Sequence, residues 1–287
     1  MVNGGSLINK FPGSNGKRPW AVVTGCTAGI GEEISYRLAK EGYNMVLISR
    51  SIDKLKAVEV NCKNQNQEIQ TKIIQVDLSK NAVNLEAYKL IRDQVNGQGV
   101  SILVNNAGVA TVGYLKDQSA ESIRDMALVN TFPYILLTCA LLPELEKNKS
   151  LIVNLASSAS WQPGPYQAIY ACTKAFDRFF SDALYSELKS KQVEVLTVCP
   201  MYVQTNMTGM EPSWKTGATS CPAFVDKAMK ACSNSTPVRI LVGPPFHTIQ
   251  TLINKMVLSS LFNYRIAYQI IENFCRKIYD SKEFANK

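Results

Sequence analysis

The stretch Trp20-Ala-Val-Val-Thr-Gly-Cys-Thr-Ala-Gly-Ile-Gly31 decides the fold that we predict for this chain of 287 residues. Its first half is a short apolar run that ends at Gly25, which is typical of a buried β-strand. A helical pattern follows as far as Lys40. The glycines permit a tight turn, and the helix N-terminus would offer free N–H groups and a positive dipole end to a pyrophosphate. The stretch therefore indicates a dinucleotide-binding turn; the alternative is a glycine-rich turn that binds nothing.

Strands and helices alternate along the rest of the chain. The apolar patterns predict strands at residues 45–49, 71–77, 101–105, 151–155, 193–199 and 238–242, and helices at residues 51–65, 85–95 and 223–231, around Asn130 and through Tyr170. Such alternation favours right-handed βαβ crossovers and a parallel sheet. We therefore predict an α/β fold with a single Rossmann-type, doubly wound parallel β-sheet, helices on both faces, and a ligand site beyond the carboxyl ends of the strands.

Three segments are expected. Residues 1–18 form an N-terminal extension without the apolar run of a secretory signal, residues 19–245 form the Rossmann-type domain, and residues 246–287 form a C-terminal helical extension. Residues 201–222 have little periodicity and several Gly and Pro, which indicates a substrate lid rather than a disordered insertion. The C-terminal helices are expected to cap the domain or to form a subunit interface, with peripheral contact to an acidic membrane as the alternative.

Composition and charge indicate which classes of ligand the chain can bind. A formal charge of +8 and an isoelectric point of about 9.0 suit an anionic ligand, such as a phosphorylated cofactor or an acyl-CoA, although a solvated basic surface is the simpler explanation. No basic run with interleaved aromatic residues occurs, so nucleic-acid binding is not expected. None of the eight cysteines forms a C-x-x-C pair, which favours buried thiols in a reducing intracellular compartment and argues against a metal site. We expect a cytoplasmic location, with the mitochondrion or a membrane surface as alternatives.

One apolar span resembles a membrane helix. Residues 126–143 carry no charge, which approaches the usual length of a transmembrane segment. Asn130, Thr131, Pro133 and Thr138 interrupt the span, and strand patterns flank it closely. A helix buried between the sheet and a neighbouring subunit explains the pattern better.

Tyr170 and Lys174 are the strongest acid–base candidates. Four residues apart in one predicted helix, they share a face. A cation within about 4–6 Å favours the phenolate, whose unperturbed pKa is about 10, so this pair can exchange a proton near neutral pH. His247 is the only histidine in the sequence, and a lone Tyr-x-x-x-Lys is a weak signal by itself.

Arg50 predicts the type of cofactor. It ends the second strand pattern, between Ser49 and Ser51, where an NAD-binding protein would place an acidic residue for the ribose 2′-hydroxyl. A guanidinium and hydroxyl groups suit a 2′-phosphate, so NADPH/NADP⁺ is favoured over NADH. The alternative is an ordinary surface charge at the start of a helix.

Four motifs occur in register between Thr24 and Lys174. They are Thr24-Gly25-x-x-x-Gly29-Ile30-Gly31, Asn105-Asn106-Ala107-Gly108, Ser157, and Tyr170-x-x-x-Lys174. In their order and spacing they resemble the short-chain dehydrogenase/reductase family. The resemblance implies a catalytic set of Tyr170, Lys174, Ser157 and Asn130, in which Asn130 would hold a water that links Lys174 to solvent. It implies cofactor contacts from Gly25, Thr27, Gly29, Ile30, Gly31, Arg50, Ser51, Asp77, Asn106, Ala107, Gly108, Tyr170, Lys174, Pro200, Val203 and Thr205.

Within this family the chain is most similar to the 17β-hydroxysteroid dehydrogenase and very-long-chain 3-oxoacyl-CoA reductase branch. Residues 46–51, 170–181 and 222–225 carry this closer resemblance, while Met201, where most members have Gly, departs from it. The branch typically begins with a membrane-anchoring apolar segment, which is not found in these residues. The resemblance implies an NADPH-dependent hydride transfer to a large apolar ketone, a 3-oxoacyl-CoA or a steroid, by a homodimer or homotetramer. The apolar residues of the lid segment, Met207, Met210, Trp214 and Phe224, would suit either substrate. The alternative function is a non-catalytic dinucleotide-binding scaffold or sensor subunit.

Overall fold

The computed structural model describes residues 6–13, 16–213, 217–243, Asn273 and Arg276. In this part of the chain, a seven-stranded parallel sheet has the order β3-β2-β1-β4-β5-β6-β7. The strands are β1 (Trp20–Thr24), β2 (Asn44–Ser49), β3 (Thr71–Gln75), β4 (Val100–Asn105), β5 (Ser150–Leu155), β6 (Val193–Val198) and β7 (Ile240–Leu241). The predicted α/β fold with a doubly wound parallel sheet is confirmed.

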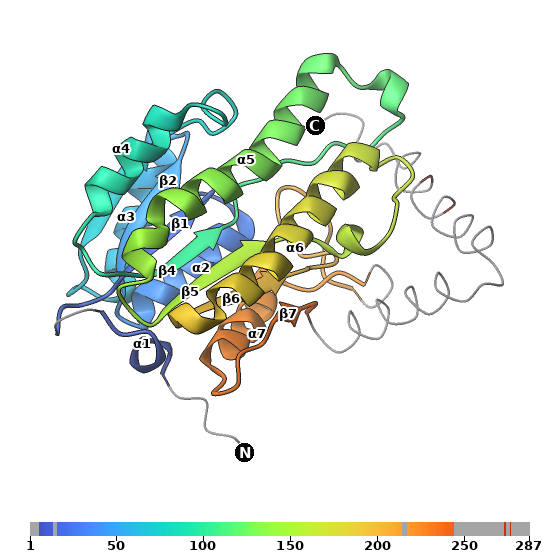
Figure 1. Cartoon of the computed structure of the whole chain (residues 1–287). Helices are drawn as coiled ribbons and strands as arrows, with labels where there is room; N and C mark the ends of the chain where they lie inside the picture. The colour runs from blue at the N-terminus through green and yellow to red at the C-terminus, as the bar shows by residue number, and fades with distance from the viewer. Residues whose placement is uncertain (1–5, 14–15, 214–216, 244–272, 274–275, 277–287) are drawn as a thin grey trace.

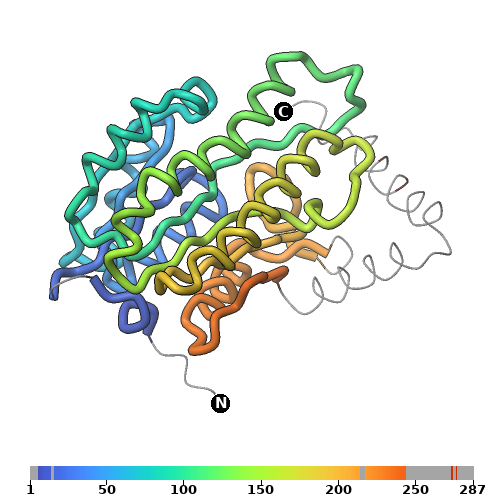
Figure 2. Tube along the Cα trace, viewed as in Figure 1, coloured from blue at the N-terminus to red at the C-terminus, as the bar shows by residue number. Residues whose placement is uncertain are grey.

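Helices cover both faces of the sheet (Figure 1). One layer contains α4 (Leu85–Val95), α5 (Ala120–Leu145) and α6 (Ala168–Leu188). The other contains α2 (Gly29–Lys40), α3 (Ile52–Gln65) and α7 (Cys221–Ser233). Figure 2 shows the consequence of the winding: the first part of the chain, in blue, builds one side of the sheet, and the later part, in green to orange, builds the other.

Two apolar cores lie on either side of the sheet. Because a strand points successive side chains to opposite faces, Ala21 and Val23 pack in the core with α2, α3 and α7. Trp20 and Val22, from the same strand, pack in the core with α4, α5 and α6. All five residues of β1 are buried, as expected for a central strand covered on both faces.

The predicted boundaries match the observed elements closely. The helix predicted at residues 85–95 coincides with α4, and Asn84 caps it by accepting a hydrogen bond from the Glu86 N–H. Strand β3 ends at Gln75, before the predicted end at Asp77, because the Asp77 carboxylate turns the chain by accepting hydrogen bonds from Ser79 N–H and Oγ–H. The helices predicted for residues 246–287 lie outside the described residues, apart from Asn273 and Arg276.

The N-terminal segment packs against the domain. Helix α1 (Leu7–Lys10) contacts α7, and Leu7 and Phe11 are buried in the core. The Tyr43 hydroxyl donates to the carbonyl groups of Leu7 (3.0 Å) and Phe11 (3.2 Å). Lys10 forms an ion pair of 2.7 Å with Glu194. Residues 6–13 therefore fasten the extension to the first core.

Helix α5 is long and apolar enough, by length and composition, to cross a membrane. In this fold it lies along the sheet between α4 and α6, with Leu137, Leu141 and Leu145 buried in the second core. Burial against the sheet thus explains why the face of α5 that packs there carries no charge between residues 126 and 143. Phe132 on the same helix is 39% exposed, so part of the apolar surface remains uncovered in the single chain.

The cysteines are only partly as expected. Cys26, Cys62, Cys199 and Cys232 are buried, and burial raises the pKa of the Cys199 thiol to about 11. Cys139 and Cys172 are exposed, however, because they face away from the sheet on α5 and α6, so the prediction of buried thiols was wrong for these two. Among the described residues, no cluster of His, Cys, Asp and Glu could hold a metal ion.

Candidate active site

The site lies where the strand order reverses. Strand β1 pairs with β2 on one side and β4 on the other, so the chain segments that follow β1 and β4 diverge at the carboxyl edge of the sheet. The Asn106 amide ties them together by donating to the carbonyl oxygens of Thr24 (3.0 Å) and Gly25 (3.1 Å). The Thr24 hydroxyl accepts hydrogen bonds from the N–H groups of Asn106 (3.0 Å) and Ala107 (3.1 Å).

The glycine turn is a close-fitting cradle. Gly25 has a φ of +63°, a conformation that side chains rarely adopt. A Cβ on Gly31 would lie 2.2 Å from Asn106 Nδ2 and 2.6 Å from the Gly25 carbonyl oxygen. The turn can hold this shape only with glycine at both positions, and it presents the N-terminus of α2 to the cleft, as the binding of a pyrophosphate requires.

A cleft runs along this edge of the sheet. Its larger part is a cavity of about 300 Å³ over the glycine turn and the ends of β2 and β3. Its smaller part is a cavity of about 110 Å³ at the ends of β5 and β6. Both parts are lined by Ile30, Asn106, Gly108, Thr205 and Met207, so the two form one continuous groove.

Most residues predicted to contact the cofactor line this groove. The larger part contains Gly25, Thr27, Gly29, Ile30, Arg50, Asp77, Asn106, Ala107 and Gly108. The smaller part contains Tyr170, Lys174, Pro200, Val203 and Thr205. Gly31 and Ser51 are not among the lining residues, because Gly31 lies beneath the turn against Asn106 and Ser51 precedes α3. Ser49, which was predicted beside Arg50, and Met207, which was predicted in the lid, also line the groove. Val129 lines it as well and was not predicted; its place next to Asn130 is the signal that would have found it.

The nucleotide end of the groove is polar. Arg50 is exposed at the end of β2, and the hydroxyl groups of Thr27 and Ser49 lie 2.7 Å apart across the glycine turn. Burial opposes the charge on Asp77, but hydrogen bonds from Ser79 outweigh it and lower the pKa of the carboxyl group. With a cation at its rim and a glycine cradle at its floor, this end fits a nucleotide that carries an extra phosphate.

Ser157, Tyr170 and Lys174 come together in the smaller part of the groove. Ser157 follows β5 and begins the 3₁₀ turn η2 (Ser158–Trp161), where its Oγ accepts a hydrogen bond of 3.1 Å from the Ala159 N–H. Tyr170 is half-buried in the first turn of α6, and Lys174 lies one turn further along. The structure thus brings the predicted serine, tyrosine and lysine together from two consecutive elements, η2 and α6.

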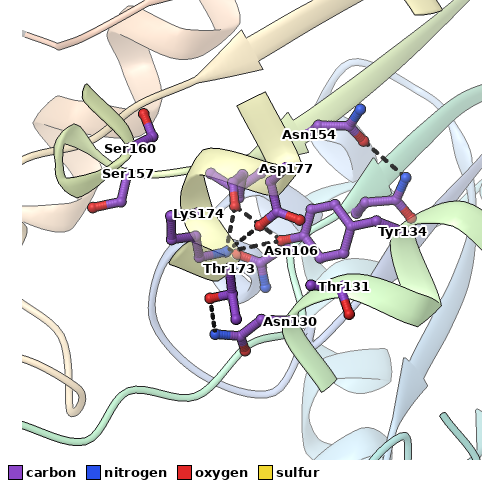
Figure 3. A network of polar contacts seen from close by, with 12 residues as sticks. Asn106, Asn130, Thr131, Tyr134, Asn154, Ser157, Ser160, Thr173, Lys174 and Asp177 are labelled. Atoms are coloured by element: carbon purple, nitrogen blue, oxygen red, sulfur yellow. Dashed lines mark hydrogen bonds and ion pairs between the residues drawn. The ribbon is translucent and has the colours of Figure 1, made fainter. Parts of the chain in front are cut away.

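Lys174 is buried, with 4% of its surface exposed. Its ammonium donates to the Leu155 carbonyl (2.7 Å) and the Asp177 carboxylate (2.9 Å), and it lies 3.5 Å from the Tyr134 hydroxyl (Figure 3). Burial opposes the charge, but Asp177 outweighs it and raises the pKa of Lys174 above its ordinary value. Lys174 is therefore a permanent cation beside the cleft.

Asn130 does not line the groove but supports it from behind. Its amide donates to the Val109 carbonyl (2.9 Å) and to the Thr173 hydroxyl (3.0 Å), and its Oδ1 accepts from the Val109 N–H (2.8 Å) (Figure 3). Both amide hydrogens are thus used within the protein. The sequence resemblance implies a water molecule at Asn130, and that water would have to donate to the remaining acceptor position of Asn130 Oδ1. The observed hydrogen bonds hold the loop after β4 against α5 and α6.

The predicted lid folds back on itself. Val203 pairs with Thr219, and the Thr208 hydroxyl donates to the Val203 carbonyl at 2.7 Å. Met207 is 46% exposed and lines both parts of the groove, as a lid residue should. Phe224, which we expected to face the substrate, is instead fully buried on α7, because its helix packs on the sheet. Trp214 lies outside the described residues.

This fold and site define a class of protein. A doubly wound sheet, a glycine cradle at its switch point, and a serine, a tyrosine and a lysine beside one cleft are the parts of a nicotinamide-dependent oxidoreductase. Residues 19–216 match the short chain dehydrogenase family, and the chain belongs to that family. It is an oxidoreductase of this family, solved relatives of which are in complex with NADP or NADPH, and the alternative of a non-catalytic scaffold is not favoured.

Individual relatives narrow the comparison. A very-long-chain 3-oxoacyl-CoA reductase of Bos taurus is 35% identical over 254 residues, covering 86% of this chain and 78% of the relative. Hydroxysteroid dehydrogenase-like protein 1 of Gallus gallus is 38% identical over 191 residues, covering 66% of this chain and 56% of the relative. A solved short-chain dehydrogenase from Sphingobium yanoikuyae in complex with NADPH has a TM-score of 0.69 at 26% identity, covering 86% of this chain and 98% of that one.

Proposed function

We propose that this chain uses NADPH to reduce the 3-keto group of a long-chain 3-oxoacyl-CoA to a hydroxyl group. The observation that carries the proposal is the convergence of Ser157, Tyr170 and Lys174 at the end of the cofactor groove. The similarity to 3-oxoacyl-CoA reductases supports the choice of substrate. The bound nicotinamide would supply the hydride, and the protein would have to orient the ketone and deliver one proton.

Tyr170 is the proposed proton donor. Its phenol would protonate the carbonyl oxygen as negative charge develops there, a contribution of about 10²- to 10⁴-fold for a positioned acid. Ser157 would hydrogen-bond the same oxygen and stabilise its developing charge. Lys174, a cation held in the next turn of the helix, would favour ionisation of Tyr170 and bind ribose hydroxyl groups of the cofactor.

The proposed remaining cofactor contacts follow the lining of the groove. Gly25, Thr27, Gly29 and Ile30 would surround the pyrophosphate, with Gly31 shaping the turn from below. Arg50 would hold the 2′-phosphate from the rim of the groove, with Ser51, which lies next to it outside the lining, as the proposed second contact. Asp77, Asn106, Ala107 and Gly108 would line the adenosine and ribose portion, while Pro200, Val203 and Thr205 would face the nicotinamide.

A lipid-like substrate suits the entrance. Met201 and Met207 line the part of the groove beside Tyr170, and flexible thioether side chains adapt to long alkyl chains. The net charge of +8 favours the phosphates of coenzyme A over an uncharged steroid. A steroid ketone is the second candidate substrate, because one relative is named hydroxysteroid dehydrogenase-like protein 1.

One panel of substrates tests the function. NADPH oxidation is measured with 3-oxoacyl-CoAs of increasing chain length, with steroid ketones and with small carbonyl compounds. We expect kcat/KM to rise with acyl chain length and to exceed that of every steroid. If steroid ketones were preferred, the proposed substrate would be a steroid and not a 3-oxoacyl-CoA. If no substrate were reduced although NADPH binds, the scaffold function would be favoured.

We also propose a homodimer or homotetramer formed through α5 and α6. Phe132, Phe176 and Phe179 are 39%, 39% and 65% exposed on these two helices, an apolar surface that a second copy would cover. Light scattering of the purified protein should give a multiple of the chain mass, and Phe179→Glu should shift it toward the monomer. A monomeric wild type would contradict the proposal.

Arg50 should decide the choice of cofactor. Arg50→Ala is expected to raise the Kd of NADPH about 30-fold, since a charge-assisted contact to a phosphate contributes about 2 kcal/mol. The Kd of NADH should change by less than about threefold, because NADH has no phosphate for the guanidinium to bind. Calorimetric titration measures both values. Lys56→Ala, an exposed cation on the adjacent helix α3, is the matched control; an equal loss of NADPH affinity there would show a general effect of charge.

A further inference from the structure

A buried carboxylate lies directly behind the proposed catalytic lysine. Asp177 is on α6, three residues after Lys174, and its side chain is completely buried. Its Oδ2 lies 2.9 Å from Lys174 Nζ, while its Oδ1 has no hydrogen-bond partner among the described residues. Figure 3 shows the carboxylate and the ammonium facing each other beside Tyr134. A buried charge with an unused acceptor is costly, so this position calls for an explanation.

We propose that Asp177 is a positioning residue that holds the Lys174 ammonium in place and offsets part of the positive charge acting on Tyr170. The inference rests on the function proposed above. It assigns to this chain a Tyr170–Lys174–Asp177 arrangement in place of a Tyr170–Lys174 pair.

Hydrogen bonding supports the positioning role. An ammonium has three N–H donors, and two of them make short bonds, to Leu155 O (2.7 Å) and Asp177 Oδ2 (2.9 Å). The third, toward the Tyr134 hydroxyl, is long at 3.5 Å. A hydroxyl group of the cofactor could accept a hydrogen bond from this third N–H with the smallest loss of existing hydrogen-bond energy. Asp177 and Leu155 would then retain the ammonium from the side away from the cleft.

Asp177 is itself held by the sheet. The Asp177 carbonyl accepts a hydrogen bond of 2.6 Å from the Ser181 hydroxyl, which accepts one of 2.9 Å from the Asn154 amide. Asn154 in turn accepts one of 2.8 Å from Asn105. This buried polar chain connects α6 to β5 and β4, so the helix turn that carries Asp177 is fixed relative to the strand ends of the site.

The electrostatic surroundings isolate the pair. The titratable groups that face it are Tyr134 from α5, Tyr170 from α6 and Cys199, which directly follows β6. The neighbouring Arg178 instead stacks between the rings of Trp161 (4.3 Å) and Phe179 (4.6 Å). Among the described residues, Lys174 is the charged group that acts on Asp177, so the ionisation of each partner governs the other.

The pKa of the Asp177 carboxyl group lies close enough to neutral pH for its charge to be changed experimentally. Burial raises the pKa of Asp177 to about 6, although Lys174 opposes this. The carboxylate is thus charged at neutral pH and is neutralised as the pH falls below this value. Removing the charge permanently should reproduce at neutral pH the state that the wild type reaches only in acid.

Asp177→Asn tests the inference through its pH dependence. Reduction requires a charged Lys174, and loss of the nearby negative charge lowers the pKa of Lys174, because Asp177 is the group that raises it. The alkaline limb of kcat/KM should therefore move down by about one pH unit or more. Asp182→Asn is the matched control, because it removes a carboxylate from the same helix that pairs with Arg178 and Arg239. Its alkaline limb should remain at the wild-type position.

A second measurement needs neither cofactor nor substrate. The Lys174 side-chain carbon signal, assigned by its absence in Lys174→Met, is followed by NMR against pH in wild type and in Asp177→Asn. The pKa of Lys174 should fall by at least one unit in the variant. If no substrate is reduced by the wild type, the proposed function fails while this titration still tests the pair. An unchanged Lys174 pKa, or a lower kcat with an unmoved alkaline limb, would overturn the inference.

Folding is checked by a double-mutant cycle. Lys174→Met and Asp177→Leu each leave a buried charge without its partner, so each should lower the Tm. The double variant replaces the pair by apolar side chains of similar size and should melt above both single variants. Additive losses of Tm in the double variant would contradict a direct coupling between the two side chains.

Discussion

Replacing Tyr170 by Phe is expected to lower kcat for ketone reduction by about 10³-fold while changing the Kd of NADPH by less than about twofold. The substitution removes only the hydroxyl group, so the ring keeps its place in the first turn of α6. Ser157 would still bind the carbonyl oxygen, but no group would deliver a proton to it. The rate is measured by single-turnover oxidation of NADPH, which excludes effects on product release.

Tyr166→Phe is the matched control for this variant. Tyr166 lies four residues earlier, and its ring packs edge-on against Tyr114 with centroids 4.8 Å apart, while the two hydroxyl groups are 3.2 Å apart. Loss of that hydroxyl should change kcat by less than about threefold, because a contact outside the reacting centre adds little to its stabilisation. If Tyr170→Phe kept more than a few per cent of wild-type activity, another group would have to be the proton donor.

The sequence predicts the sheet well because the relevant physics is local. Strands buried on both faces are continuous apolar runs, and the glycine turn must follow the first of them. The motifs then fall at strand ends, and parallel strands bring these ends to one edge. Ser157 therefore lies at this edge because of the fold class, and Tyr170 reaches the same edge at the start of α6, the α-helix that follows β5.

Asp177 could not be assigned in the same way. A Lys and an Asp three residues apart on a helix usually form an exposed ion pair, so nothing in their spacing indicates burial. A signal is present in retrospect: Lys174, Asp177, Ser181, Leu184 and Leu188 recur at intervals of three and four and are all buried. Polar residues on the apolar face of a helix escape a search for hydrophobic periodicity. The prediction that Phe224 faces the substrate was wrong because an apolar residue next to a lid can equally well belong to the hydrophobic core.

Gly31→Ala is expected to weaken NADPH binding by about 100-fold, because strain of up to about 3 kcal/mol would displace the turn that binds the pyrophosphate. Two effects oppose each other at this position. Ala is favoured over Gly in a helix by about 1 kcal/mol, and Gly31 lies in the first turn of α2. The new Cβ, however, would lie 2.6 Å from the backbone oxygen of Gly25 and 2.2 Å from Asn106 Nδ2. The clash outweighs the propensity, because neither neighbour can move without breaking the hydrogen bond between Asn106 and Gly25.

Gly97→Ala separates this local effect from a general loss of stability. Gly97 has a φ of +72°, and nothing lies within 4 Å of an added Cβ, so the substitution carries backbone strain of about 1 kcal/mol without a clash. It should lower the Tm and leave the Kd of NADPH unchanged, since residue 97 lies in the turn before β4, at the edge of the sheet opposite the groove. If Gly31→Ala bound NADPH as tightly as the wild type, the close approach of α2 to Asn106 would not be what shapes the cofactor site. The glycine at residue 31 would then be dispensable for binding, and the pyrophosphate site would have to be assigned to other N–H groups of the turn.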